Sequence, residues 1–374
     1  MKTILPALLL VVTSTPAVAA ENWSWTGDAR GGLLGSETRN RAGATSDTTS
    51  WRARVRAGTA TTLTDDWSLA ARAAVRLDTR QDALSFGLDW AAPTPSGLGL
   101  GDATIDSLYL TYAPDAGAWR VRMGRFQSPF ALDGVASKSL DRNDSPSFDV
   151  SWTDGVWVER RGDAWTAHVI LQHNDASGPT NALRAPLAFD DGASRVGAYF
   201  GLAGNAPVGP FVQRMLGVTW LPRALAPFGV GHAVREDYWA VTAKMAAEWE
   251  TPVVGTQLLL AGEIGYAPVT PGQTVMGSGH GDAGGIAWQT SANLLEVFPS
   301  HSVGVVYGRV ADGWLVSPDF TPNEWLLEAR WLWRYSATLA FDARVRRRSE
   351  IDVPFAALHP RRVGDFYVRA TWRF

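Results

Sequence analysis

Along several stretches of the chain, apolar and polar residues alternate one by one. From residue 51 to residue 57 the odd positions are apolar and the even positions are arginine. In the last ten residues, one face of an extended strand would carry Phe366, Val368, Ala370, Trp372 and Phe374. A period of two places alternate side chains on opposite faces of a β-strand, and the 3.6-residue period of a helix is absent from these segments.

Sixteen segments of this kind can be placed along the chain. We expect strands at residues 23–34, 50–63, 67–79, 104–113, 118–126, 155–161, 164–173, 194–202, 211–221, 237–250, 256–266, 285–298, 302–310, 323–334, 337–348 and 365–374. Short connections, such as 64–66, alternate with long ones, such as 35–49, 127–154 and 311–322. The direction of the chain within 194–236 is ambiguous, so 14 or 18 strands also fit the sequence.

Short turns that alternate with long loops are typical of transmembrane β-barrels. A soluble β-protein would bury its apolar faces in a core, whereas a transmembrane barrel turns them to lipid and lines a wet lumen with the polar faces. Many of the 18 tryptophans fall at predicted strand ends, as in the aromatic girdles of such barrels. We therefore predict an all-β fold, a transmembrane antiparallel β-barrel of 16 strands. Its last strand pairs with the strand that begins near Trp23, because hydrocarbon does not tolerate an open sheet edge.

The N-terminus has the features of a secretory signal peptide at residues 1–20. Lys2 supplies a positive charge, an apolar stretch runs from Ile4 to Val12, and Ala17-Val18-Ala19 offers a cleavage site. The barrel domain is then expected over residues 21–374. No later stretch reaches 18 uninterrupted apolar residues, so we expect no membrane-spanning helix. The expected location is the outer membrane of a Gram-negative cell.

The composition argues against several kinds of chemistry. The chain has no cysteine, which excludes disulfides, zinc–thiolate sites, iron–sulfur clusters and thiol nucleophiles. Its net charge of −3 argues against binding nucleic acid through bulk positive charge. The six histidines form no ligand pattern, and no motif marks a nucleophile with its base. We expect no metal, no cofactor and no enzymatic activity, and an outer-membrane hydrolase is the enzymatic alternative.

Arginine is distributed unevenly along the chain. Of the 34 basic residues only Lys2, Lys138 and Lys244 are lysines. The segments 1–80 and 309–374 hold 20 of the 31 arginines, and residues 236–308 hold none. Closure of the barrel makes the two arginine-rich segments neighbours. They predict a basic wall of the lumen that consists of Arg30, Arg52, Arg54, Arg56, Arg72, Arg76, Arg120, Arg122, Arg330, Arg344, Arg346, Arg348 and Arg369.

Fixed guanidinium groups along a lumen concentrate anions, because arginine stays charged at ordinary pH. The basic wall therefore favours a channel that prefers anions. The alternative is that these arginines only pair with wall carboxylates and leave the channel weakly selective. The candidate partners are Asp28, Asp78, Glu328 and Asp342.

The segment after the fifth predicted strand carries a recognisable motif. A G-x-F-x-x-P-F-x-L-acid pattern is matched by Gly124, Phe126, Pro129, Phe130, Leu132 and Asp133. Ser137-Lys138 and Asp141-Arg142 match a following S-S-K stretch and acid–arginine pair more loosely. The segment 105–175 thereby resembles the phosphate-selective porin O/P family. The resemblance implies a trimeric, 16-stranded porin whose third loop folds into the barrel as a constriction loop. The site residues of that loop would be Asp133, Lys138, Asp141 and Arg142.

The loop holds more acidic than basic residues, so we expect an acidic loop to face the basic wall, as in general diffusion porins. Together these features predict an outer-membrane porin that lets small hydrophilic solutes diffuse passively, with a preference for anions such as phosphate. A weakly selective general diffusion porin is the alternative. The expected partners are small hydrophilic or anionic solutes, outer-membrane lipid, two further copies of the chain, and the barrel-assembly machinery, but no nucleic acid. The assembly signal would lie in the C-terminal strand, in Phe366, Trp372 and Phe374.

Overall fold

The computed structural model describes residues 23–80, 85–86, 102–114, 117–144, 148, 150–173, 196–225, 236–276, 281–353 and 357–374. Its strands are β1 (Trp23–Arg39), β2 (Thr45–Thr62), β3 (Trp67–Asp78), β4 (Ser85–Phe86), β5 (Asp102–Tyr112), β6 (Trp119–Phe126), β7 (Thr153–Arg161), β8 (Trp165–His173), β9 (Val196–Gly204), β10 (Phe211–Leu225), β11 (Glu236–Glu250), β12 (Gln257–Tyr266), β13 (Ile286–Phe298), β14 (His301–Val310), β15 (Glu324–Trp333), β16 (Leu339–Glu350) and β17 (Arg362–Arg373). A single helical turn, α1 (Gln273–Met276), lies between β12 and β13. No helix in the described part is long and apolar enough to cross a membrane. The predicted signal peptide lies outside the described residues.

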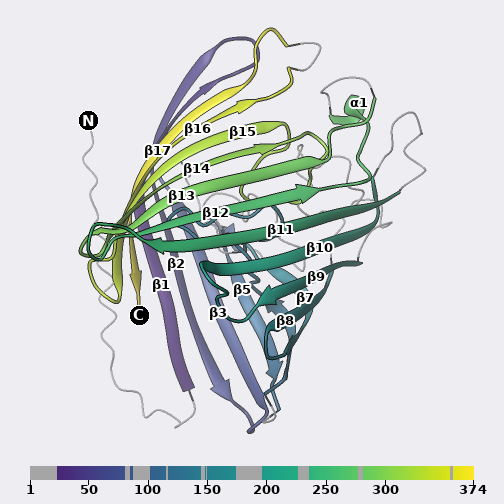
Figure 1. The fold of residues 1–374 in the computed structure, drawn as a ribbon, viewed down its shortest axis with the longest axis vertical. Coiled ribbons are helices and arrows are strands. Elements are labelled where there is room, and N and C mark those ends of the chain that lie inside the picture. Colours follow the sequence, from purple (N-terminus) through teal and green to yellow (C-terminus); the bar gives the residue numbers. More distant parts are fainter. Residues whose placement is uncertain are drawn as a thin grey trace.

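The strands form one closed antiparallel barrel (Figure 1). Each long strand pairs with the long strands before and after it, and β17 returns to pair with β1 from Asp28↔Arg373 to Arg39↔Arg362. The two-residue β4 runs parallel to the start of β5 and leaves 16 strands in the wall. The ambiguous segment contributes β9 and β10, which pair antiparallel with each other. The prediction of a 16-stranded closed barrel is confirmed.

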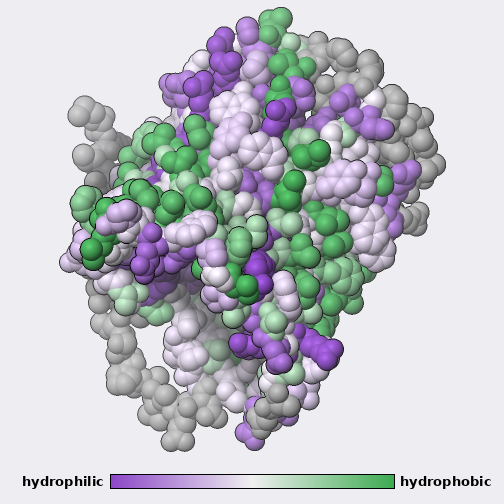
Figure 2. All heavy atoms as spheres, viewed as in Figure 1, coloured by the Kyte–Doolittle hydropathy of each residue, from purple (hydrophilic) through white to green (hydrophobic). Residues whose placement is uncertain are grey.

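Alternate residues face opposite sides of this wall, as the sequence pattern predicts. On β2, Trp51 is 62% exposed on the outside, whereas Arg54 is fully buried inside the barrel. On β16, Val345 is 66% exposed and its neighbour Arg344 is buried. Apolar residues gather across the outer surface in the middle of the molecule, and hydrophilic ones gather at its upper end (Figure 2). The polar faces of the strands therefore line the interior.

The connections differ between the two ends of the barrel. Both described termini lie at the end with the short turns, and the longer connections lie at the other end (Figure 1). The prediction of a long loop at residues 35–49 is wrong, because β1 and β2 continue as a long hairpin whose turn spans only residues 40–44. The Asn40 side chain closes the turn by accepting hydrogen bonds from Ala42 N and Ala44 N, both 3.0 Å. Apolar alternation fades here because a hairpin that extends beyond the hydrocarbon has polar surroundings on both faces.

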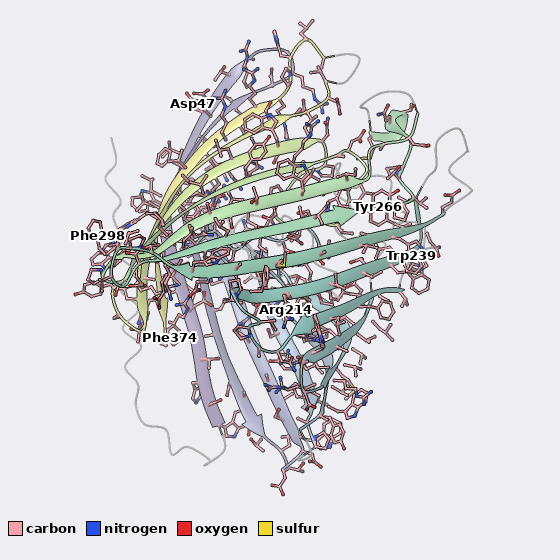
Figure 3. All side chains as sticks on the ribbon, viewed as in Figure 1. Asp47, Arg214, Trp239, Tyr266, Phe298 and Phe374 are labelled. Carbon is pink, nitrogen blue, oxygen red and sulfur yellow. The ribbon has the colours of Figure 1, made fainter. Side chains whose placement is uncertain are left out.

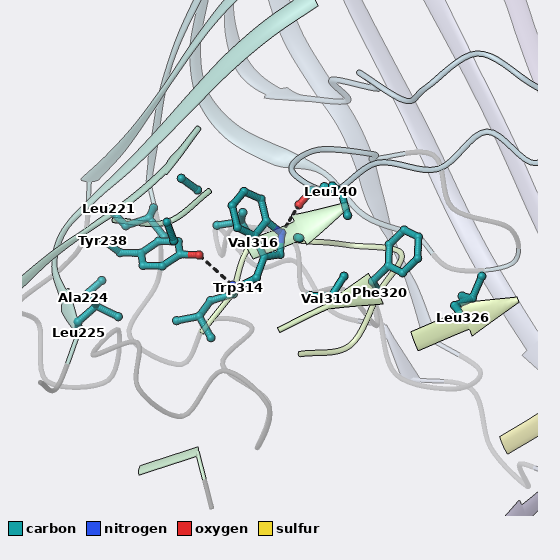
Figure 4. Packing of buried hydrophobic residues seen from close by; sticks show 14 of the residues in the cluster. Leu140, Leu221, Ala224, Leu225, Tyr238, Val310, Trp314, Val316, Phe320 and Leu326 are labelled. Atoms are coloured by element: carbon teal, nitrogen blue, oxygen red, sulfur yellow. Dashed lines mark hydrogen bonds between the residues drawn. The ribbon is translucent and has the colours of Figure 1, made fainter. Parts of the chain in front are cut away.

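The main hydrophobic cluster lies inside the barrel, not between sheets. It joins Leu140, from the loop after β6, to residues of the loop after β14 and to the inner wall (Figure 4). Trp314 is fully buried and donates from Nε1 to the Leu140 carbonyl at 2.7 Å, and Leu315 N donates to the Tyr238 hydroxyl at 2.9 Å. The sequence predicts the loop after β14 only as a long connection, 311–322. It folds inward because its apolar residues Trp314, Leu315, Val316 and Phe320 are buried there between the inner wall and the loop after β6.

Candidate pore and constriction

The segment between β6 and β7, described at residues 127–144, 148 and 150–152, crosses the interior of the barrel. We call it the constriction loop. Asp133 N donates to Gln213 Oε1 on β10 and Val135 N donates to Asn293 Oδ1 on β13, both at 2.9 Å. Further along, Lys138 Nζ lies 2.9 Å from Glu328 Oε2 on β15, which stands almost opposite β6 in the ring of strands. The prediction of an inward-folded loop is confirmed.

A buried ion network fixes the middle of the constriction loop to β11 and β12. Asp141 Oδ1 lies 2.5 Å from Lys244 Nζ, which also lies 3.2 Å from Glu263 Oε1. The Thr242 hydroxyl donates to Asp141 Oδ2 at 2.7 Å, and Leu140 N donates to Glu263 Oε2 at 3.0 Å. Burial by itself would raise the pKa of Asp141, but the adjacent Lys244 ammonium outweighs it and holds that pKa below its usual value. The loop is thus anchored by charge, not only by packing.

Two further charged residues of the loop, Arg142 and Asp144, also point away from the basic wall. Arg142 donates to Gln172 on β8 and to the Thr153 hydroxyl, and its guanidinium lies 5.0 Å from the centre of the Tyr199 ring. Asp144 accepts a hydrogen bond from Ser128 N at 2.9 Å. These contacts hold the loop against the wall formed by β7 to β9.

Asp133 is the fourth predicted site residue of the loop. It lies near Glu248 of β11, and burial together with that carboxylate raises its pKa. The expectation that an acidic loop faces the basic wall is therefore wrong, since the described carboxylates of the loop anchor it to β7–β12 or lie against that part of the wall. The charged side chain that the loop does turn to the basic wall is Lys138. Burial lowers the pKa of Lys138, and Glu328 only partly offsets this effect.

A cavity of about 650 Å³ remains between the constriction loop, the loop after β14 and the inner wall from β15 round to β2. Among its described lining residues, two are acidic, Asp319 and Asp365. Nine are cationic: Arg30, Arg52, Lys138, Arg330, Arg344, Arg346, Arg348, Arg361 and Arg369. Seven of these cations belong to the predicted basic wall. The sequence interpretation missed the contributions of Arg361 and Asp319, because it assigned the lumen only to residues of the strands and of the constriction loop.

One carboxylate and one aromatic ring organise the arginines of this cavity. Asp365 on β17 accepts from Arg344 Nη2 at 2.5 Å and from Arg346 Nε at 2.9 Å, and Arg348 Nη2 lies 3.8 Å away. The buried ring of Tyr367 lies beneath Arg344, whose Cζ is 4.3 Å from the ring centre. Arg369 and Arg330 approach the same ring at 5.2 and 5.8 Å. Stacking and shared hydrogen bonds fix the directions of these guanidinium groups.

The ion pairs of the wall arginines agree in part with the alternative hypothesis, in which these arginines only pair with wall carboxylates. Asp28 pairs with Arg30, Arg54 and Arg56, and Arg52 pairs with Asp78 at 2.7 Å. Arg330 pairs with Glu328 at 2.6 Å, and Arg369 pairs with Asp342 at 2.8 Å. These four carboxylates do not line the cavity, whereas most of their partners do. A solute in the cavity thus meets guanidinium groups first.

Six residues of the predicted wall lie away from this cavity. Arg54, Arg56, Arg72 and Arg76 face the interior, but Gln127 of the constriction loop covers part of this group by accepting from Arg56 at 3.0 Å and from Arg72 at 2.7 Å. Arg120 and Arg122 stand on β6. Arg122 lies 4.5 Å from the Trp157 ring centre, and Arg120 lines a separate cavity of about 420 Å³ beside the short turns. Sequence alone could not show where the loop divides the lumen.

The C-terminal aromatic residues lie on the outer face, at the seam between β17 and β1. Phe366, Trp372 and Phe374 are each about half exposed. A Cβ atom at Gly27 would lie 2.4 Å from the Phe374 ring, and one at Gly35 would lie 2.3 Å from the Phe366 ring. Only glycine leaves room for these rings to lie flat across β1.

No protein family model matches the chain, and no curated protein matches it in sequence. Solved structures share its fold. OprB of Pseudomonas putida is 12% identical, with 94% of each chain covered and a TM-score of 0.64. An anion-selective porin of Comamonas acidovorans is 11% identical, with 94% of this chain and 99% of that chain covered and a TM-score of 0.55. OccAB4 of Acinetobacter baumannii is 12% identical over 94% of this chain and 98% of that chain, with a TM-score of 0.51.

Proposed function

We propose that this protein is an outer-membrane porin, a water-filled channel through which small hydrophilic solutes diffuse passively, with a preference for anions. The observation that carries the proposal is the charge around the cavity beside the constriction loop, where nine of the described lining residues are cationic and two are acidic. Fixed positive charge in a confined aqueous space raises the local concentration of anions and lowers that of cations. An anion-selective porin with the same fold supports this reading.

The arrangement also suits phosphate-like ions. Arginine presents a planar fork of donors that matches the oxygens of phosphate or carboxylate, and Lys138 adds a point charge from the opposite side of the cavity. The resemblance of residues 105–175 to the phosphate-selective porin O/P family favours the same solute class. Weak selectivity is the second candidate, because eight carboxylates among the described residues pair with wall arginines and reduce the net field. They are Asp28, Asp78, Asp106, Glu159, Glu324, Glu328, Asp342 and Asp365.

The remaining parts of the proposal concern the route to the membrane. Residues 1–20 direct export, and the assembly machinery recognises the C-terminal strand through its outward aromatic side chains. Three copies assemble into the trimer that the family resemblance implies. Enzymatic activity is not proposed. Among the described residues, no group of three or more His, Asp or Glu could hold a metal ion.

Planar-bilayer recording tests the proposal directly. Purified protein should give discrete conductance steps, and a tenfold KCl gradient should give a reversal potential of the sign expected for chloride. Addition of phosphate should reduce the chloride current if phosphate binds in the cavity. Absence of steps would reject the channel, and a reversal potential near zero would favour weak selectivity over anion preference.

A further inference from the structure

Three exposed arginines form a patch on the outer face of the barrel, at the end with the long loops. Arg39 on β1 stands directly opposite Arg362 on β17. Arg347 on β16 stands opposite Gly364, two positions from Arg362, so the two are diagonal neighbours. Directly opposed residues place their Cβ atoms about 5 Å apart, and diagonal neighbours remain within reach of long side chains. We call these three residues the outer arginine patch.

No ion pair within the described part of the protein neutralises the outer arginine patch. Like charges directly opposite each other destabilise a strand pair. Among the described residues, no acidic side chain lies within ion-pair distance of Arg39, Arg347 or Arg362. The nearest outward acids, Glu37 and Asp47, stand opposite each other on β1 and β2; Figure 3 labels Asp47 beside this end of the barrel. Glu37 is diagonal to Arg362, and Asp47 is diagonal to Arg39, but neither acid forms an ion pair with the patch. Interior arginines, in contrast, mostly pair with carboxylates, so the outer patch is open to an external anion.

The position of the patch identifies the source of that anion. Val345 and Phe366, on the same outer face of the same strands, are 66% and 45% exposed, as expected for residues in contact with lipid tails. Arg362 lies ten residues along β17 from Trp372. At ~3.3 Å per residue and a tilt of ~40°, this separation is ~25 Å along the membrane normal, the height of the apolar band of such barrels. The patch therefore stands at the level of the lipid headgroups on the long-loop side.

We propose that the outer arginine patch binds the phosphate groups of a phosphorylated glycolipid in the leaflet on that side. A headgroup with two phosphates would satisfy three adjacent guanidinium groups, and phosphate accepts paired hydrogen bonds from arginine. The lipid chains would continue down the apolar surface below the patch. This site is distinct from the channel: it requires the barrel to lie in a membrane, but it does not require the barrel to conduct ions.

Native mass spectrometry of the detergent-solubilised protein tests the proposal, with bisphosphorylated lipid A as the probe. The variant Arg39→Ser, Arg347→Ser, Arg362→Ser should bind the probe at least about tenfold more weakly than wild type, whereas lysine at the same three positions should retain most of the binding. The matched control is Arg160→Ser, Arg214→Ser. These two arginines stack on Trp119 and Trp165, at 5.2 and 5.0 Å from the ring centres, beside the short turns. The control should bind the probe like wild type.

Equal binding by the serine variant and the wild type would overturn the proposal, as would equal binding of fully dephosphorylated lipid A. Loss of the oligomer with the lipid retained would assign the patch to contacts between copies of the chain and would also overturn it. Heat-modifiable migration on gels shows that each variant is folded. Conductance recorded on the same preparations keeps the two proposals separate, because a silent barrel that binds lipid A would refute the channel and leave this site intact.

Discussion

Removing charge from β16 should weaken the anion preference of the pore by an amount that the geometry predicts. Arg344, Arg346 and Arg348 line the cavity and share Asp365. Changing the three to serine alone would leave Asp365 buried without partners, which typically costs 3–5 kcal/mol of stability. The variant for measurement therefore also carries Asp365→Asn, so that the net change is the loss of two positive charges.

The size of the effect follows from the size of the cavity. A sphere of 650 Å³ has a radius of about 5 Å, so with one contact distance added an ion at its centre lies about 8 Å from each wall charge. In a wet pore, two charges at ~8 Å change the electrostatic energy of an ion by ~1 kcal/mol, and screening by 0.1 M salt reduces this energy to ~0.5 kcal/mol. The field acts with opposite sign on anions and cations, so the permeability ratio should fall about fivefold.

Reversal potential in a KCl gradient is the assay. A tenfold change in ratio corresponds to at most about 59 mV for a monovalent ion, so a fivefold change should move the reversal potential toward that of cations by up to about 40 mV. The shift should grow at 0.01 M salt, where the screening length is ~30 Å, and vanish near 1 M, where it is ~3 Å.

The chain offers a matched control on the same strand. Arg347 lies between Arg346 and Arg348 but is exposed on the outer face. Arg347→Ser removes a charge from the same part of β16 without changing the lumen, so the reversal potential should stay at its wild-type value. If the lumen variant also keeps the wild-type potential at low salt, the arginines do not determine selectivity and the anion preference must be abandoned.

Three further predictions concern assembly and the inner loops. Deleting Trp372–Phe374 removes the end of the seam with β1 and should abolish heat-modifiable migration; normal migration would show that the seam forms without it. Trp314→Ala, which removes a fully buried ring and its hydrogen bond to Leu140, should lower the free energy of unfolding in urea by about 3–5 kcal/mol, and a loss below 1 kcal/mol would contradict the packing described. Deleting Ser137–Asn143 should raise single-channel conductance, whereas an unchanged value would mean that this loop does not narrow the pore.

The sequence predicted the wall of the barrel well because a strand with lipid on one face and water on the other must alternate. Arg344, Val345 and Arg346 show this directly, with one apolar side chain outside and two arginines inside. The alternation of apolar and polar residues ends where the strands no longer face lipid tails. Beyond the hydrocarbon, β1 and β2 meet polar surroundings on both faces, so their continuation to Arg39 and from Thr45 could not be distinguished from a loop.

The interior was harder to predict, because it depends on contacts between residues far apart in the chain. Charge counting placed acids on the constriction loop but could not show that Asp141 turns to Lys244, more than 100 residues away. It also missed that the loop after β14 enters the lumen. Its apolar residues, with Trp314 at the centre, were a signal for this, since an external loop has no reason to carry them.

The constriction loop has a mechanical consequence. A ring of hydrogen-bonded strands resists stretching around its circumference but flattens easily into an oval. The loop is a chord across this ring, bonded to β8, β10, β11, β12, β13 and β15. A chord fixed at both sides prevents flattening, so the cross-section should keep its shape when lateral pressure in the bilayer changes. The charged anchor can be cut by Lys244→Met combined with Asp141→Asn and Glu263→Gln, so that no carboxylate is left buried without its cation. This change would leave every wall charge of the cavity in place, and we expect it to convert a steady current into a fluctuating one.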